Sequence, residues 1–270
     1  MPEASFLMPL ALMGYGACAG STLLALRRGR PTWPLTAAAL AAALALHTLA
    51  LAARWGTQGH GPFTTLHEIL SSNLWSLALV FAIAAWTVRE VRCALVIALL
   101  PLTVLAAWLM VSHPGPGHLP PTYDTPLLYL HTVVGKLYLG LLLVAAALGL
   151  LPALARSGWG RRLAPQGPSP ARCDELAHRF AAFAFVFDTL MLIVGAVWAQ
   201  DAWGRYWAWD PLESWAFASW IALAAALHAR ATLRPRPELF GAMLAGVFVL
   251  AFLTFFGVPF LSTAPHKGAI

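Results

Sequence analysis

The sequence predicts an all-α protein, a polytopic membrane helix bundle of about eight transmembrane helices with both termini on the outer side of the membrane. Of the 270 residues, 60% are hydrophobic and only 10% are charged, whereas a soluble domain carries about 25% charged residues. The hydrophobic residues stand in long, unalternating runs. Such runs indicate helices, because backbone polar groups in lipid must bond within their own segment.

Eight apolar stretches approach the length of about 20 residues that a spanning helix needs. They cover residues 6–26, 34–53, 68–88, 93–112, 127–152, 179–199, 211–229 and 239–260. No internal repeat is apparent, so we expect residues 1–270 to form a single membrane domain. The longest connection, 153–178, contains several arginines and prolines and is predicted to be a cytoplasmic loop.

The basic residues assign a side to each connection. Those that follow the first, third, fifth and seventh stretches share one side if the helices alternate: Arg27, Arg28, Arg30, Arg89, Arg92, Arg156, Arg161, Arg162, Arg172, Arg230, Arg234 and Arg236. The loops of the other side contain only Arg54, Arg205 and Lys267. The positive-inside rule therefore places both termini outside. The same placement accounts for the net charge of +6 without a nucleic-acid partner.

The cysteines argue against a redox or c-type haem motif, and the first apolar stretch argues against a signal peptide. Cys18, Cys93 and Cys173 form neither CxxC nor CxxCH, so the chain has no thioredoxin-type pair and no c-type haem attachment site of its own. Structural thiols are favoured, with Cys173 expected in the basic loop. The first stretch lacks a basic n-region and an obvious cleavage site, which predicts a retained helix and not a signal peptide.

Tryptophans concentrate around one predicted outer loop. Residues 203–220 read WGRYWAWDPLESWAFASW and hold five of the 12 tryptophans: Trp203, Trp207, Trp209, Trp215 and Trp220. An interfacial aromatic belt is the alternative, but a belt needs only about one or two per helix end. We favour a flat aromatic platform in an outer loop at about 200–220. A porphyrin suits it, because its π faces stack on indoles and its propionates pair with a guanidinium.

The candidate haem-binding residues follow from this interpretation: Trp203, Arg205, Tyr206, Trp207, Trp209, Asp210, Glu213 and Trp215. Arg205 is the one arginine of the segment, so it is the candidate propionate ligand. Asp210, Pro211 and Glu213 also form a helix start, with Asp210 as N-cap and Glu213 at the third position. For the two carboxylates a capping role is favoured over a ligand or catalytic role.

Three of the nine histidines are candidate iron ligands. His131 opens the 127–152 helix and His266 follows the last helix, both on the predicted outer side. Two imidazoles can fill both axial positions of one haem iron. His228 closes the 211–229 helix, roughly 23 Å from Glu213 at about 1.5 Å per residue. It therefore implies a second, deeper site.

The other histidines have simpler expectations. His60, His67, His113 and His118 line an entrance or are solvated, and solvation is favoured. His47 is expected to be a buried, hydrogen-bonded residue within its helix.

The stretch from Gly195 to Arg230, GAVWAQDAWGRYWAWDPLESWAFASWIALAAALHAR, resembles the WWD signature of the CcsA/ResC family of cytochrome c biogenesis proteins of System II. Residues 61–68, Leu130-His131 and residues 257–268 also resemble family segments. One departure is Leu212, where the family usually has Lys, which leaves more of the propionate pairing to Arg205.

The resemblance implies a function and partners. Family members act with a CcsB/ResB membrane protein in the cell inner (plasma) membrane. Together they bring haem b to the periplasmic face and attach it to apocytochrome CxxCH thiols, as a holocytochrome c synthase (haem lyase). By residue match, His131 and His266 would ligate the outer haem iron. His228 would ligate an inner haem whose other ligand belongs to the partner.

Three alternatives stay open. One is a HemX-like haem-binding assembly or sensor protein without attachment activity. The second is a membrane solute transporter with intramembrane histidines. The third is a cytochrome b-type electron carrier that holds its haems permanently.

Overall fold

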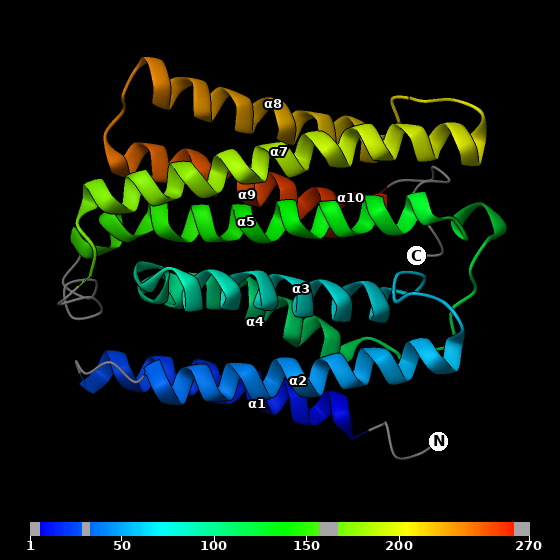
Figure 1. The fold of residues 1–270 in the computed structure, drawn as a ribbon, viewed down its shortest axis with the longest axis horizontal. Coiled ribbons are helices and arrows are strands. Elements are labelled where there is room, and N and C mark those ends of the chain that lie inside the picture. The colour runs from blue at the N-terminus through cyan, green and yellow to red at the C-terminus, as the bar shows by residue number, and fades with distance from the viewer. Residues whose placement is uncertain (1–5, 29–32, 157–166, 262–270) are drawn as a thin grey trace. The chain divides into compact units, whose positions relative to one another are not determined.

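The computed structural model describes residues 6–28, 33–156 and 167–261, and every regular element in these ranges is helical (Figure 1). The elements are α1 (Leu7–Arg28), α2 (Trp33–Gln58), α3 (Leu66–Thr87), η2 (Arg89–Ala94), α4 (Leu95–Val111), η3 (Pro121–Tyr123), α5 (Pro126–Arg156), α7 (Pro170–Trp203), α8 (Pro211–Thr232), α9 (Pro237–Phe256) and α10 (Val258–Leu261). The predicted all-α fold is confirmed.

Seven helical segments of the described residues are long and apolar enough to cross a membrane. The predicted multi-pass membrane class is therefore confirmed. The predicted stretch 211–229 folds as the 22-residue helix α8, which is not among those seven. Its hydropathy is lowered by Glu213 and Ser214 in its first turn and by His228 and Arg230 near its end. An eighth span, and the side on which the termini lie, remain predictions.

The connection expected at 153–178 is much shorter, and that boundary prediction is wrong. α5 continues to Arg156 and α7 begins at Pro170, so Cys173 lies buried in a helix and not in a loop. Ion pairs of Glu175 with Arg172 and Arg179 lie three and four residues apart along α7. Such pairs stabilise a helix in water, so the helix extends beyond its apolar part.

The chain divides into two compact units. One consists of residues 1–116 and 151–170, and the other of residues 117–150 and 171–270. The main helices of the first unit are α1 to α4. Those of the second unit are α5, α7, α8 and α9 (Figure 1).

In the first unit, α1 packs against α2 through small residues. A Cβ atom at Gly14 would lie 2.8 Å from the Cβ of Ala43, so glycine lets the two helices approach closely. The His47 imidazole on α2 joins α1 to α3, because its Nδ1 lies 3.1 Å from Tyr15 Oη and its Nε2 lies 2.9 Å from Ser71 Oγ. The expectation that His47 is buried and hydrogen-bonded is confirmed.

The start of α3 is fixed by a capping box. Thr65 is the N-cap and accepts a hydrogen bond from the backbone N–H of Glu68. The buried Glu68 carboxylate accepts in return from the Thr64 hydroxyl (2.8 Å) and from Arg54 Nε on α2 (2.8 Å). Arg54 also donates to the carbonyl of Gly115 (2.6 Å). One ion pair thus joins α2, α3 and the loop after α4.

In the second unit, α5 and α9 meet at two glycines. A Cβ atom at Gly241 would lie only 1.9 Å from the carbonyl oxygen of Gly149. Backbone therefore lies directly against backbone at this crossing, which small residues permit between membrane helices.

Candidate functional site

The tryptophan-rich segment is a short loop between two helices. α7 ends at Trp203, and α8 begins at Pro211. Residues 211–220 belong to α8, in agreement with the helix predicted at 211–229, and residues 200–203 belong to α7, so within the predicted loop region of about 200–220 only residues 204–210 lie outside a helix. Gly204 has φ +72° and Trp209 has φ 57°. A bulky residue in the left-handed region is strained and persists only where its surroundings hold it.

The capping box predicted for α8 holds this loop in place. Asp210 Oδ1 accepts from the backbone N–H of Glu213 (2.8 Å), and Glu213 Oε2 accepts from the backbone N–H groups of Asp210 (3.4 Å) and Ala208 (2.7 Å). Glu213 is 6% exposed. The predicted capping role of both carboxylates is confirmed.

One aromatic cluster lies between α5, α7 and the segment before α5. Trp198 is buried, and its ring meets Trp203 edge-on at 4.9 Å and Tyr123 edge-on at 5.1 Å between centroids. Its indole N–H donates to the carbonyl of Thr122 (3.1 Å). Trp198 and Tyr123 were not predicted as site residues. Trp198 was visible in the sequence, in the stretch that resembles the WWD signature, but its contact with Tyr123 depends on tertiary packing.

A second aromatic cluster lies in the loop and the first turns of α8. The rings of Trp207 and Trp209 meet edge-on at 5.7 Å, and both meet Phe217 edge-on. Phe217 stacks on Trp220 at 5.8 Å. The expectation of one flat platform is therefore wrong, because neighbouring indoles in the loop are nearly perpendicular (84°).

The exposed side of the loop carries the candidate ligand-contacting groups. Arg205, Tyr206, Trp209 and Trp215 are exposed. The indole nitrogen of Trp207, in contrast, is buried and has no hydrogen-bond partner in the described structure. A buried donor without an acceptor is costly.

His131 is held in one orientation by backbone and by an aromatic ring. Its Nδ1 lies 3.0 Å from the carbonyl oxygen of Met191, and its ring stacks on Trp198 at 5.9 Å and 27°. A carbonyl only accepts, so Nδ1 carries the hydrogen. In a neutral imidazole the lone pair is then on Nε2, the arrangement typical of a metal-binding histidine. Gly195 leaves room for this ring, since a Cβ atom there would lie 2.8 Å from His131 Cε1.

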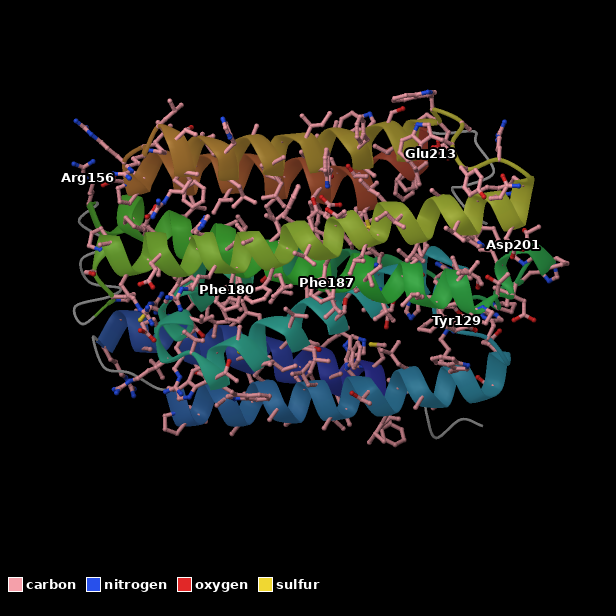
Figure 2. The ribbon with its side chains drawn as sticks, turned by 45° about the horizontal axis from the view of Figure 1, so that its top comes forward. Tyr129, Arg156, Phe180, Phe187, Asp201 and Glu213 are labelled. Atoms are coloured by element: carbon pink, nitrogen blue, oxygen red, sulfur yellow. The ribbon has the colours of Figure 1, made fainter. Side chains whose placement is uncertain are left out.

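His228 lies at the opposite end of the second unit. Arg230 donates through Nε and Nη2 to Asp174 Oδ2 (2.9 and 2.5 Å), so the end of α8 meets the beginning of α7. We call this the arginine end, and we call the end with Trp203 and Pro211 the tryptophan end. Figure 2 shows Tyr129, Asp201 and Glu213 together at the tryptophan end. The structure thus keeps His131 and the exposed His228 apart.

The remaining predicted histidines differ in their exposure. His113 and His118 are exposed, as expected for solvated side chains, whereas His67 is half-buried with Nδ1 3.0 Å from Ser112 Oγ. His60 is buried, so the expectation of solvation is wrong for it: Nδ1 lies 2.9 Å from the Gly61 carbonyl oxygen. His266 lies outside the described residues. Within the described ranges, no three His, Cys, Asp or Glu side chains gather as a metal site.

The sequence is similar to proteins of one known family. Residues 32–266 match the family described as cytochrome C assembly protein. The "Cytochrome c biogenesis protein CcsA" of Guillardia theta is 43% identical over 94 residues, which span 35% of this chain and 31% of that relative. The protein of the same name from Prochlorococcus marinus is 29% identical over 251 residues, covering 82% of this chain and 80% of the relative.

A solved structure shares the fold. The "Cytochrome c Heme Lyase CcmF" aligns with a TM-score of 0.72 at 19% identity, over 94% of this chain and 46% of that one. At this identity the likeness concerns the fold alone. Since the family match covers most of the sequence, the chain belongs to the cytochrome c assembly protein family, and the predicted resemblance to its CcsA members is confirmed.

Proposed function

We propose that this chain binds haem b and presents it for covalent attachment to apocytochrome c, acting with a second membrane protein of the CcsB/ResB type. The observation that supports it most directly is the orientation of His131. Its Nδ1–H donates to the Met191 carbonyl, which places the imidazole lone pair on Nε2, the atom that would bind iron. That histidine stacks on a buried tryptophan, Trp198.

The residues of the tryptophan end fit a haem. Trp203, Tyr206, Trp207, Trp209 and Trp215 offer apolar ring surface to a porphyrin. The exposed Arg205 would pair with the propionates. Asp210 and Glu213 act indirectly, by holding the loop that carries Trp207 and Trp209.

His131 and His266 would ligate the haem iron at this end, and His228 would ligate a second haem at the arginine end with a ligand from the partner. The exposure of His228 supports this assignment, because a shared ligand set needs an accessible imidazole. In this proposal the tryptophan end faces outward in the cell inner membrane, and the arginine end faces the cytoplasm.

The protein contributes binding and orientation to the attachment reaction. When bound, haem supplies the vinyl groups to which the cysteine thiols of a CxxCH segment add. In this proposal His131 would hold the iron, the loop aromatics would contact the porphyrin, and Arg205 would hold the propionates. A holocytochrome c synthase would thus consist of this chain and its partner together.

The test is the reduced-minus-oxidised absorption spectrum of the chain, purified alone and with its partner. We expect a low-spin b-type signal that SDS releases as non-covalent haem. The signal should weaken in His131→Ala and persist in His113→Ala, a matched loss of an exposed histidine. A complex that stays colourless after expression with added haem contradicts the proposal and favours a solute transporter. Stable haem with no cytochrome maturation favours a HemX-like protein.

A further inference from the structure

A buried carboxyl group lies in the middle of the second unit, away from both candidate haem sites. Asp188 is the nineteenth residue of the 34-residue helix α7 and is 0% exposed. It follows Phe187, which Figure 2 shows midway along this helix. Neither of its carboxyl oxygens has a hydrogen-bond partner in the described structure. An acid at such a position in a membrane helix is costly and calls for a specific role.

One hydroxyl group from a neighbouring helix adjoins this acid, and it is hydrogen-bonded to a second hydroxyl from another helix. Tyr138 on α5 is also 0% exposed, and its side chain neighbours the Asp188 carboxyl without the geometry of a formed hydrogen bond. The Tyr138 hydroxyl donates to Ser219 Oγ on α8 (3.3 Å), and Ser219 donates to the Ala216 carbonyl (2.8 Å). The three side chains come from three different helices.

The direction of these hydrogen bonds decides whether the ionised or the protonated Asp188 carboxyl group suits its surroundings. The hydrogen of Tyr138 is used on Ser219, so the Tyr138 oxygen presents lone pairs to the carboxyl. A carboxylate only accepts and would find no donor there. A protonated carboxyl carries an O–H that can donate to Tyr138. The cluster therefore matches the neutral acid, whose proton lies next to the Tyr138 hydroxyl, and Tyr138 is in turn hydrogen-bonded to Ser219.

The charged groups on the neighbouring helices are not placed to neutralise an ionised Asp188. The charged residues of α8 and α9 are Glu213, Arg230 and Glu238, and all three lie in the terminal turns of their helices. On α5, Lys136 lies two positions before Tyr138, about 200° around the helix, and so projects to another face. An ionised Asp188 would be a buried charge in a low-dielectric interior, which is strongly unfavourable.

We propose that Asp188, Tyr138 and Ser219 form a proton-binding site inside the membrane, in which Asp188 holds a proton and exchanges it through the Tyr138 hydroxyl. The ligand of the site is the proton itself. The site uses neither of the candidate iron ligands His131 and His228.

Infrared difference spectroscopy of the full-length protein in lipid nanodiscs tests the bound proton. Near neutral pH, the carbonyl stretch of a protonated carboxylic acid should be present in the wild type and lost in Asp188→Asn. Asp201→Asn, which changes an exposed aspartate on the same helix, should keep that band. If Asp188→Asn does not fold, Asp188→Glu should retain an acid band at a shifted frequency. Identical spectra for the wild type and a folded Asp188→Asn protein would overturn the proposal.

Transfer into deuterium oxide tests the exchange route. Deuteration shifts the carbonyl band of an acid, so the shift records proton exchange at Asp188. Tyr138→Phe and Ser219→Ala should each lengthen the half-time of this shift, because each breaks the hydroxyl chain. A half-time unchanged in both variants, or a wild-type band that never shifts, would show that Asp188 is not in exchange through Tyr138.

Discussion

At the scale of single residues, the position of the His131 ring depends on Gly195 having no Cβ atom. Gly195 has no Cβ, and a Cβ there would lie 2.8 Å from Cε1 and 2.9 Å from Nδ1 of His131. Neither the hydrogen bond to Met191 nor the stack on Trp198 tolerates a displaced ring. Gly195 is therefore a positioning residue for the candidate iron ligand.

Gly195→Ala should consequently weaken haem binding by roughly tenfold, the lower range for groups that orient a metal ligand. The measurement is haem titration followed by absorption, with the low-spin signal reduced or mixed with a high-spin form. Gly246→Ala is the control, since a Cβ atom at Gly246 meets nothing within 4 Å. Equal haem affinity in Gly195→Ala and the wild type would contradict a ligand role for His131 in this orientation.

The sequence predicted the role of a side chain correctly where its partners lie within one helical turn. The caps Asp210 and Glu213 were predicted because an N-cap and its third residue interact within one turn. His60 was mispredicted as solvated, because its burial depends on the packing of the segment before α3 and not on its own sequence neighbours. Asp188 was not singled out, since nothing nearby in the sequence marks Tyr138 and Ser219 as its neighbours.

At the scale of elements, each unit uses the same device to begin a helix. Glu68 at the start of α3 and Glu213 at the start of α8 are buried, and each accepts backbone N–H groups of the preceding residues. A carboxylate at the positive end of a helix is stabilised there. In α8 this interaction also determines the path of the loop with Trp207 and Trp209.

Glu213→Ala should therefore lower the free energy of unfolding by about 1–2 kcal/mol, the range for losing a cap. The measurement is denaturation in detergent, combined with tryptophan fluorescence as a readout of the loop. Glu213→Gln retains an acceptor oxygen and should cost less. If the alanine variant kept both wild-type stability and the wild-type emission, the cap would not hold the loop.

The crossing of α5 and α9 makes a second prediction at this scale. In Gly241→Ala the new methyl group would fall 1.9 Å from the carbonyl oxygen of Gly149, so the two backbones must separate. Overpacking of this kind typically costs about 1–3 kcal/mol. We expect a lower Tm for Gly241→Ala and an unchanged Tm for Gly246→Ala, the same change on an open face of α9. Equal Tm values in the two variants would refute the close crossing.

Helix boundaries were predicted well where lipid contact sets them. The predicted stretch 34–53 corresponds to α2, and 127–152 corresponds to α5, each extended by a few residues. The prediction failed for α7, whose first turns are polar and carry the Glu175 ion pairs. Hydropathy reports the part of a helix that is in contact with lipid, whereas hydrogen bonds and ion pairs decide where the helix ends.

At the scale of the whole molecule, the two candidate haem sites lie at opposite ends of the second unit. Their separation predicts that the two haem sites lose occupancy independently. In the complex with a CcsB/ResB-type partner, His228→Ala should remove one haem per complex and leave the His131-dependent signal. His131→Ala should do the reverse. Haem quantification of the two single variants and the double variant checks this. Loss of both signals in either single variant would indicate one shared site.

The sequence alone determined the membrane class, the approximate place of every long helix, the family and the caps of α8. Each of these depends on properties that act along the chain, namely hydropathy over one span, the spacing within one helical turn and a contiguous motif. Only the tertiary structure showed the Met191 and Trp198 contacts of His131, the perpendicular indoles of the loop and the Asp188–Tyr138–Ser219 cluster. These contacts join residues 50 or more positions apart or depend on ring orientation, so packing of helices against one another decides them.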